Sequence, residues 1–237
     1  MPPATEQQHH HIDWFRHTGP YIRSHRGRTF VVYLGDGALE SNQFQNIIHD
    51  LALLHLLGIR LVLVHATRTA IEAELLQQCI ESRLHKGVRI TDHAVLNVVR
   101  NVTAAQRLTL ESKLSMGLPD SPMRGARLRV VSGNFVTARP IGIVDGVDFQ
   151  FTGAVRRLDA VAIAAALDQQ AIVLLSPLGF SPTGEVFNLS ADELATAAAI
   201  ATGADKLIML DEHEGLIDAD GQLVRQCTIE SARALPT

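Results

Sequence analysis

Apolar residues in this chain fall into short runs separated by longer segments of helical periodicity. The runs at 29–34, 59–65, 171–176 and 206–210 show no regular alternation with polar residues, which is typical of parallel strands buried on both faces. Helical spacing predicts helices over 43–57, with Gly58 as its C-cap, and over 69–84, 92–116, 159–169 and 190–203. Alternating buried strands and helices predict an α/β fold, a three-layer αβα sandwich with a mostly parallel sheet.

Several weaker signals fill the remaining sequence. Segments 128–132 and 135–144 are predicted to form a pair of strands, and Ser190 and Glu193 fit a capping box at the start of a helix. Residues 215–226 indicate a hairpin that turns at Asp220-Gly221. A weak helix start over 228–237 has no strand after it, so we expect a C-terminal truncation.

The first residues differ in character from the rest. Residues 1–11 are polar and predict a disordered lead, and residues 12–24 indicate a short amphipathic helix broken near Gly19-Pro20. This helix carries Trp14 and Tyr21, in a chain with one Trp and two Tyr. Exposed aromatic residues favour contact with another subunit. We therefore expect a lead and interaction helix over 1–26 and one folded domain over 27–237.

Composition narrows the class of protein. The net charge of −4 gives no reason to expect a nucleic-acid partner. No run approaches the roughly 18 apolar residues that a membrane span requires. The start lacks the regions of a signal peptide, and Cys79 and Cys227 are too few for a disulfide framework. These features predict a cytoplasmic protein, and the histidines show no metal-ligand spacing.

The first strand runs into a glycine-containing turn in which Tyr33 is followed by Gly35, Asp36 and Gly37. In open parallel sheets ligands bind at the carboxyl ends of strands. Segments 65–68, 176–179 and 188–193 are expected at the same edge. None of them is a GxGxxG or Walker sequence, so dinucleotide and P-loop chemistry have little support.

Longer segments point to a family. The most specific are Phe15-Arg-His-Thr-Gly-Pro-Tyr-Ile22, Val88-Arg-Ile-Thr-Asp92, Gly125-Ala-Arg-Leu-Arg-Val-Val-Ser-Gly-Asn-Phe135 and Leu174-Leu-Ser-Pro-Leu-Gly-Phe-Ser-Pro-Thr-Gly-Glu185. From Phe15 to Gln226 the chain resembles proteins of the amino-acid kinase fold and, within it, the bacterial N-acetylglutamate synthases.

The resemblance implies a pocket that has lost its phosphate chemistry. In the related acetylglutamate kinases the first strand ends in Lys-x-Gly-Gly, where this chain has Tyr33 and Asp36. A glycine run is replaced by residues 66–68, which include Arg68, whereas Asn188 and Asp192 match a later asparagine and aspartate of the kinases. Loss of one preorganised electrostatic group typically costs about 3 kcal/mol of barrier. Phosphoryl transfer is therefore disfavoured.

In the synthases this domain resembles the arginine-binding regulatory half, which a separate acetyltransferase domain follows. The resemblance implies that the whole protein transfers acetyl from acetyl-CoA, its substrate, to L-glutamate in arginine biosynthesis. It implies no catalytic residue, metal or cofactor in this chain. L-arginine is the expected effector, with His17, Tyr21 and Arg60 as candidate binding or interface residues. A homo-oligomer formed through the N-terminal helix is also implied.

Two alternatives remain open from the sequence, and a third class has little support. The chain could be a working acetylglutamate kinase in which Arg68 replaces the missing cation. It could be a stand-alone regulatory subunit that assembles with a separate acetyltransferase. A hydrolase triad has little support, because sequence alone singles out no His and Asp partners for Ser132 or Ser176.

Overall fold

A five-stranded parallel sheet forms the centre of the protein. The computed structural model describes residues 6–116, 128–211, 215–218 and 221–233, with side chains from Arg16 onward. Every neighbouring pair of strands in the central sheet is parallel. Four of its strands come from the four predicted apolar runs, and the fifth comes from segment 128–132. The strand order is β13 (Lys206–Leu210), β1 (Thr29–Leu34), β2 (Arg60–His65), β10 (Ala171–Leu175) and β5 (Arg129–Val131).

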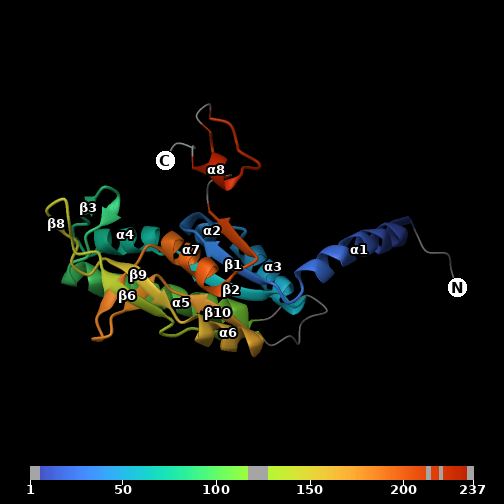
Figure 1. Ribbon diagram of the computed structural model, residues 1–237, viewed down its shortest axis with the longest axis horizontal. Coiled ribbons are helices and arrows are strands. Elements are labelled where there is room, and N and C mark those ends of the chain that lie inside the picture. The colour runs from blue at the N-terminus through green and yellow to red at the C-terminus, as the bar shows by residue number, and fades with distance from the viewer. Residues whose placement is uncertain (1–5, 117–127, 212–214, 219–220, 234–237) are drawn as a thin grey trace.

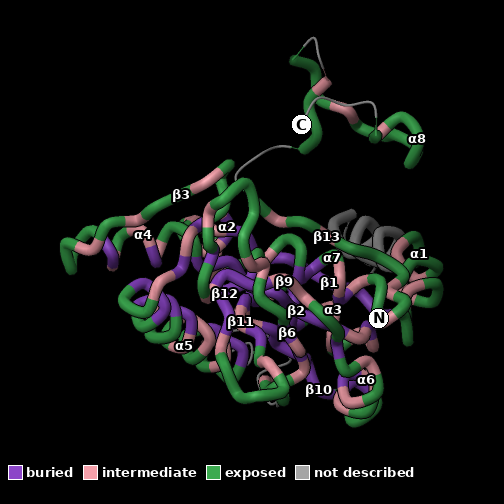
Figure 2. Tube along the Cα trace, turned by 60° about the vertical axis from the view of Figure 1, so that its left-hand side comes forward, coloured by how far each residue is buried: buried purple, intermediate pink, exposed green. Residues whose placement is uncertain are grey.

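Side chains of successive residues leave this sheet on opposite faces and build two separate cores. On one face, Val31 and Tyr33 pack with residues of α6 (Ala160–Asp168) and α7 (Ala191–Thr202). On the other, Val32 and Leu34 pack with residues of α3 (Phe44–Leu56) and α5 (His93–Ser115). Figure 2 shows the buried positions concentrated in the central strands and at the inner sides of these helices. The predicted three-layer sandwich is confirmed.

A smaller, mixed sheet lies beside the first core. Its order is β12 (Val186–Asn188), β11 (Leu178–Phe180), β6 (Val136–Pro140) and β9 (Gly153–Leu158). Two hairpins of very short strands accompany it, β3 (Leu84–His85) with β4 (Val88–Arg89) and β7 (Ile143–Val144) with β8 (Val147–Asp148).

The expected pairing of segments 128–132 and 135–144 is wrong. β5 pairs with β10 in the central sheet, whereas β6 pairs with β9 and β11 in the smaller one. The second segment also divides into β6 and β7. Both segments are apolar enough to be strands, but adjacency in sequence does not decide which edge each strand joins.

Two predicted helices have different ends. α4 covers Arg68–Gln77 and stops well before residue 84, because Cys79 has a φ of 54°, which no right-handed helix can continue. Ser190 begins α7 without a capping hydrogen bond, since its hydroxyl bonds the Asp192 carboxylate instead. The expected capping box is therefore absent. The helix does end at Gly203 as predicted, and this glycine has a left-handed φ of 59°.

The N-terminal helix is longer than predicted and projects from the body of the protein (Figure 1). α1 covers Glu6–His25 without interruption. The lead expected over 1–11 is thus helical from Glu6 onward, and Pro20 lies inside the helix instead of breaking it. Trp14 lies outside the described side chains, whereas Tyr21 is 69% exposed.

The other end of the chain also leaves the body. Figure 1 shows the segment with α8 (Ile229–Ala232) standing apart from the two sheets. The predicted hairpin is present as a single antiparallel bridge between Ile217 and Leu223. Asp220, at its expected turn, and the last four residues lie outside the described residues. Among the described residues, no helix combines the length and the apolar character needed to cross a membrane.

Candidate ligand-binding hollow at the strand ends

The carboxyl ends of β1, β2 and β13 meet at a hollow of about 810 Å³. Backbone hydrogen bonds join them: the amide after β1, on Gly35, donates to the Leu210 carbonyl over 2.7 Å. The short helix α2 (Asp36–Glu40), the first residues of α4 and α7, and the β3–β4 hairpin complete the walls. Six of the seven residues predicted for the former kinase pocket line this hollow, namely Tyr33, Asp36, Gly37, Arg68, Asn188 and Asp192.

Gly35, the seventh, lies just outside the lining and is the N-cap of α2. A Cβ added at this position would overlap the carboxylate of Asp211. Glycine therefore allows the Asp211 carboxylate to lie directly against the turn after β1. The turn after β1 thus lies against a negative charge.

Tyr33 lies near the carboxyl end of β1 and lines the hollow. Burial is the main reason that the pKa of its phenol is raised to about 12, and the carboxylates of Asp211, Asp192 and Asp36 add to the effect. The Arg68 guanidinium acts in the opposite direction. The phenol is consequently neutral at pH 7, so this position supplies no charge to a phosphate.

Asp36 fills the amino end of α4. The backbone amides of Thr69 and Arg68 donate hydrogen bonds to its carboxylate, which lowers its pKa, although burial has the larger effect and raises the pKa overall. Unpaired amides at a helix N-terminus form a ready site for phosphate. Here those two amides already have an anionic partner within the protein. The Asp36 carboxylate thus occupies the two amides and would repel a phosphate placed beside them.

Arg89 is the most buried cation of the hollow, with 8% of its surface exposed. Its guanidinium forms an ion pair with Glu72 at 2.8 Å and donates a hydrogen bond to the Ser82 hydroxyl at 2.6 Å. This links the β3–β4 hairpin to α4. Because Glu72 neutralises Arg89, the second arginine of the hollow adds little positive potential for a ligand.

Asn188 is held by a buried hydrogen-bond network between the hairpin and the smaller sheet. Its side-chain amide donates to the Thr91 hydroxyl at 3.1 Å, and the Thr152 hydroxyl lies 2.9 Å from that same group. The Thr91 amide in turn donates to the Thr152 hydroxyl. Fully satisfied buried networks of this kind fix side-chain positions. Asn188 is therefore a rigid wall of the hollow.

The structure gives Ser176 a histidine partner that sequence did not single out. His65 Nε2 lies 2.9 Å from the Ser176 hydroxyl, and Nδ1 lies 3.2 Å from the Ala66 carbonyl. That carbonyl can only accept, so Nδ1 carries the proton and Nε2 accepts from Ser176. His65 has no exposed surface and Ser176 does not line the hollow. The pair consequently joins the end of β2 to the residue after β10, with its histidine fully buried.

The three candidates for arginine binding do not form one cluster. His17 and Tyr21 lie four residues apart on α1 and are both exposed, so they share one face of that helix. Arg60 points to α6 instead, where it forms an ion pair with Asp168 at 2.9 Å. A recess at the carboxyl end of α1 is lined by Arg23, Arg26 and Arg28 among others.

The hollow is poorly suited to phosphoryl transfer. None of the described residues lining it is a lysine, and five carboxylates face two guanidinium groups: Asp36, Glu40, Glu72, Asp192 and Asp211 against Arg68 and Arg89. Phosphoryl transfer depends on neutralising the charge of the phosphates. In this hollow the excess of carboxylates would add negative charge beside a phosphate instead of neutralising it.

Known proteins similar to this chain identify its family. The chain belongs to the amino acid kinase family, whose model matches residues 28–235. Among more specific relatives, the amino-acid acetyltransferase of Pseudomonas putida strain GB-1 is 54% identical over 216 residues, which are 91% of this chain and 50% of that protein. The counterpart in Azotobacter vinelandii is 53% identical over the same share. The chain spans about half the length of the curated relatives it matches.

Solved structures agree with this assignment. N-acetylglutamate synthase from Neisseria gonorrhoeae, in complex with coenzyme A and L-arginine, superposes with a TM-score of 0.87 at 33% identity, over 94% of this chain and 53% of that one. Carbamate kinase from Giardia lamblia, with a TM-score of 0.53 at 13% identity, shares the fold alone. The resemblance inferred from the sequence motifs is confirmed.

Proposed function

We propose that this chain is the arginine-sensing, kinase-like part of an N-acetylglutamate synthase. In the whole protein, acetyl would pass from acetyl-CoA to the α-amino group of L-glutamate in the cytoplasm, as the first step of arginine biosynthesis. This part would neither transfer acetyl alone nor phosphorylate acetylglutamate. The observation that carries the proposal is the strand-end hollow, in which Tyr33 is neutral and Asp36 caps the amino end of α4. It occurs in a chain 54% identical to an amino-acid acetyltransferase.

The side of α1 offers suitable groups for arginine. The exposed Tyr21 ring can stack on a guanidinium group, and His17 lies on the same helix face. The arginine-lined recess near the end of α1 attracts a carboxylate. Because α1 projects from the body with Tyr21 exposed (Figure 1), the same face is also where we place contacts with further copies of the chain. Such contacts would bring the effector site close to a subunit interface.

Calorimetric titration with L-arginine tests this function. We expect saturable binding that His17→Ala and Tyr21→Ala each weaken about tenfold, the loss of one interaction with a charged group. His49→Ala, which changes a histidine of α3 outside both recesses, serves as the control and should bind as the unmodified chain does. L-citrulline, which lacks the positive charge, should not bind. Absence of any L-arginine binding, or equal binding by all variants, would overturn this proposal.

A further inference from the structure

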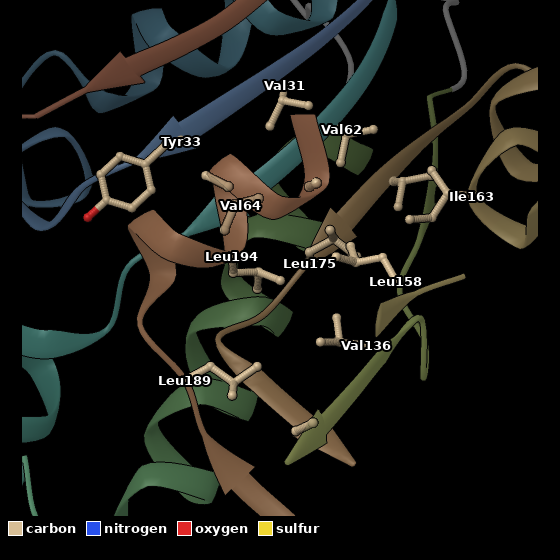
Figure 3. Packing of buried hydrophobic residues seen from close by; sticks show 14 of the residues in the cluster. Val31, Tyr33, Val62, Val64, Val136, Leu158, Ile163, Leu175, Leu189 and Leu194 are labelled. Atoms are coloured by element: carbon tan, nitrogen blue, oxygen red, sulfur yellow. The ribbon is translucent and has the colours of Figure 1, made fainter. Parts of the chain in front are cut away.

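Tyr33 has a packed ring and a hydroxyl that faces the strand-end hollow. The Tyr33 side chain is 9% exposed and packs in the core beneath α7. Figure 3 shows its hydroxyl pointing away from the other labelled core residues, toward the hollow that Tyr33 lines. None of the described residues makes a hydrogen bond to it. The hydroxyl is therefore open to the hollow and available to a ligand there.

The surroundings of this hydroxyl favour positive charge. The carboxylates of Asp211, Asp192 and Asp36 all act electrostatically on Tyr33, opposed by Arg68 alone. Asp36 keeps oxygen lone pairs free beyond its bonds to the amino end of α4. Arg89, farther along the wall, is neutralised by Glu72. The phosphate end of the family pocket has thus become an acidic end.

The cation that fits is an organic one. Among the described residues, no group of three His, Cys, Asp or Glu side chains could hold a metal ion. The hollow, at about 810 Å³, is also far larger than a bare cation. An ammonium or guanidinium group, in contrast, presents several N–H donors spread over a wider volume. Such donors match acceptors that stand apart from one another around a hollow.

We propose that the strand-end hollow binds a small organic cation through a primary ammonium or guanidinium group. Its N–H groups donate to the Tyr33 hydroxyl oxygen and to the carboxylates of Asp192 and Asp36. This site is separate from the effector site placed on α1 and does not depend on it.

Titration with agmatine, which has a guanidinium and an ammonium group but no carboxylate, tests this site. At pH 7.5 and low salt, agmatine is expected to bind the unmodified chain, and Tyr33→Phe is expected to weaken binding at least about tenfold by removing one hydrogen bond to a charged group. Phenylalanine keeps the packed ring, so Tyr33→Phe should melt at the same temperature as the unmodified chain. Asp50→Asn, at an exposed position of α3, makes a matched control of charge and should bind normally.

A second variant keeps the test independent of Tyr33. Asp192→Asn should weaken agmatine binding by a similar factor, and putrescine should compete with agmatine. The proposal is overturned if agmatine does not bind, if it binds Tyr33→Phe and Asp192→Asn as tightly as the unmodified chain, or if inorganic phosphate competes for the site. L-arginine binding that is lost in Tyr21→Ala but retained in Tyr33→Phe would support the α1 site while leaving the agmatine result to decide this one.

Discussion

Replacing Glu72 with glutamine is expected to lower the free energy of unfolding by about 3 kcal/mol, because it leaves the buried guanidinium of Arg89 without its counter-charge. The expected value lies at the low end for a buried ion pair, since the Glu72 side chain is 39% exposed whereas that of Arg89 is 8% exposed. Urea unfolding followed by circular dichroism measures the difference. Because the pair joins the β3–β4 hairpin to α4, the hairpin should also become more susceptible to proteolysis.

Two comparison variants isolate the ion pair. Glu74→Gln changes the same residue type on the same helix, where the carboxylate bonds only the exposed Gln78 among the described residues, and should cost little. The double variant Glu72→Gln with Arg89→Met removes both charges and should recover much of the lost stability. If Glu72→Gln and Glu74→Gln unfold at the same urea concentration, Arg89 does not depend on Glu72 for its charge balance.

Acid is expected to lower the free energy of unfolding by a similarly large amount. Burial lowers the pKa of His65 from 6.5 to about 4, because the interior disfavours the charged imidazolium. Between these two pH values the unfolded chain binds a proton that the folded chain does not. Stability therefore falls as the pH drops from 6.5 to 4, and the contribution of His65 to this loss is about 3 kcal/mol.

The pH effect is measured as a difference between two chains. The free energies of unfolding of the unmodified chain and of His65→Asn are compared from pH 7 to pH 4, so that contributions of other groups cancel. The advantage of histidine over asparagine should shrink by about 3 kcal/mol over this interval. Two curves that stay parallel would show that His65 takes up its proton in the folded state as readily as in the unfolded one.

The central sheet could be predicted because its strands are buried on both faces. Segments 29–34, 171–175 and 206–210 are strands very nearly as their apolar runs indicate. The hairpins β3–β4 and β7–β8 were missed, since two-residue strands are too short to show any period. The sequence feature that could have predicted them is the glycine in each turn, at Lys86-Gly87 and Asp145-Gly146. Both residues of each turn have positive φ, as two-residue hairpin turns of type I′ require.

The hollow was predicted in outline by one rule, that ligands bind where parallel strands end. The same rule would have found Asp211, which directly follows β13. Arg89 and Glu72 could not be found in this way. They are neighbours only because the short hairpin folds against α4, and nothing in the spacing of the two residues indicates that contact. His65 and Ser176 likewise meet only through the pairing of β2 with β10.

An ATP assay tests the central claim most directly, namely that this hollow has lost the charge pattern needed for phosphoryl transfer. ADP release is followed in a coupled reaction with Mg²⁺, ATP and N-acetylglutamate, with and without the protein. The charges around Tyr33 and Asp36 predict no ADP above the protein-free background, whether or not N-acetylglutamate is added. ADP formation that requires N-acetylglutamate and disappears in Arg68→Ala would contradict the account and identify a working kinase.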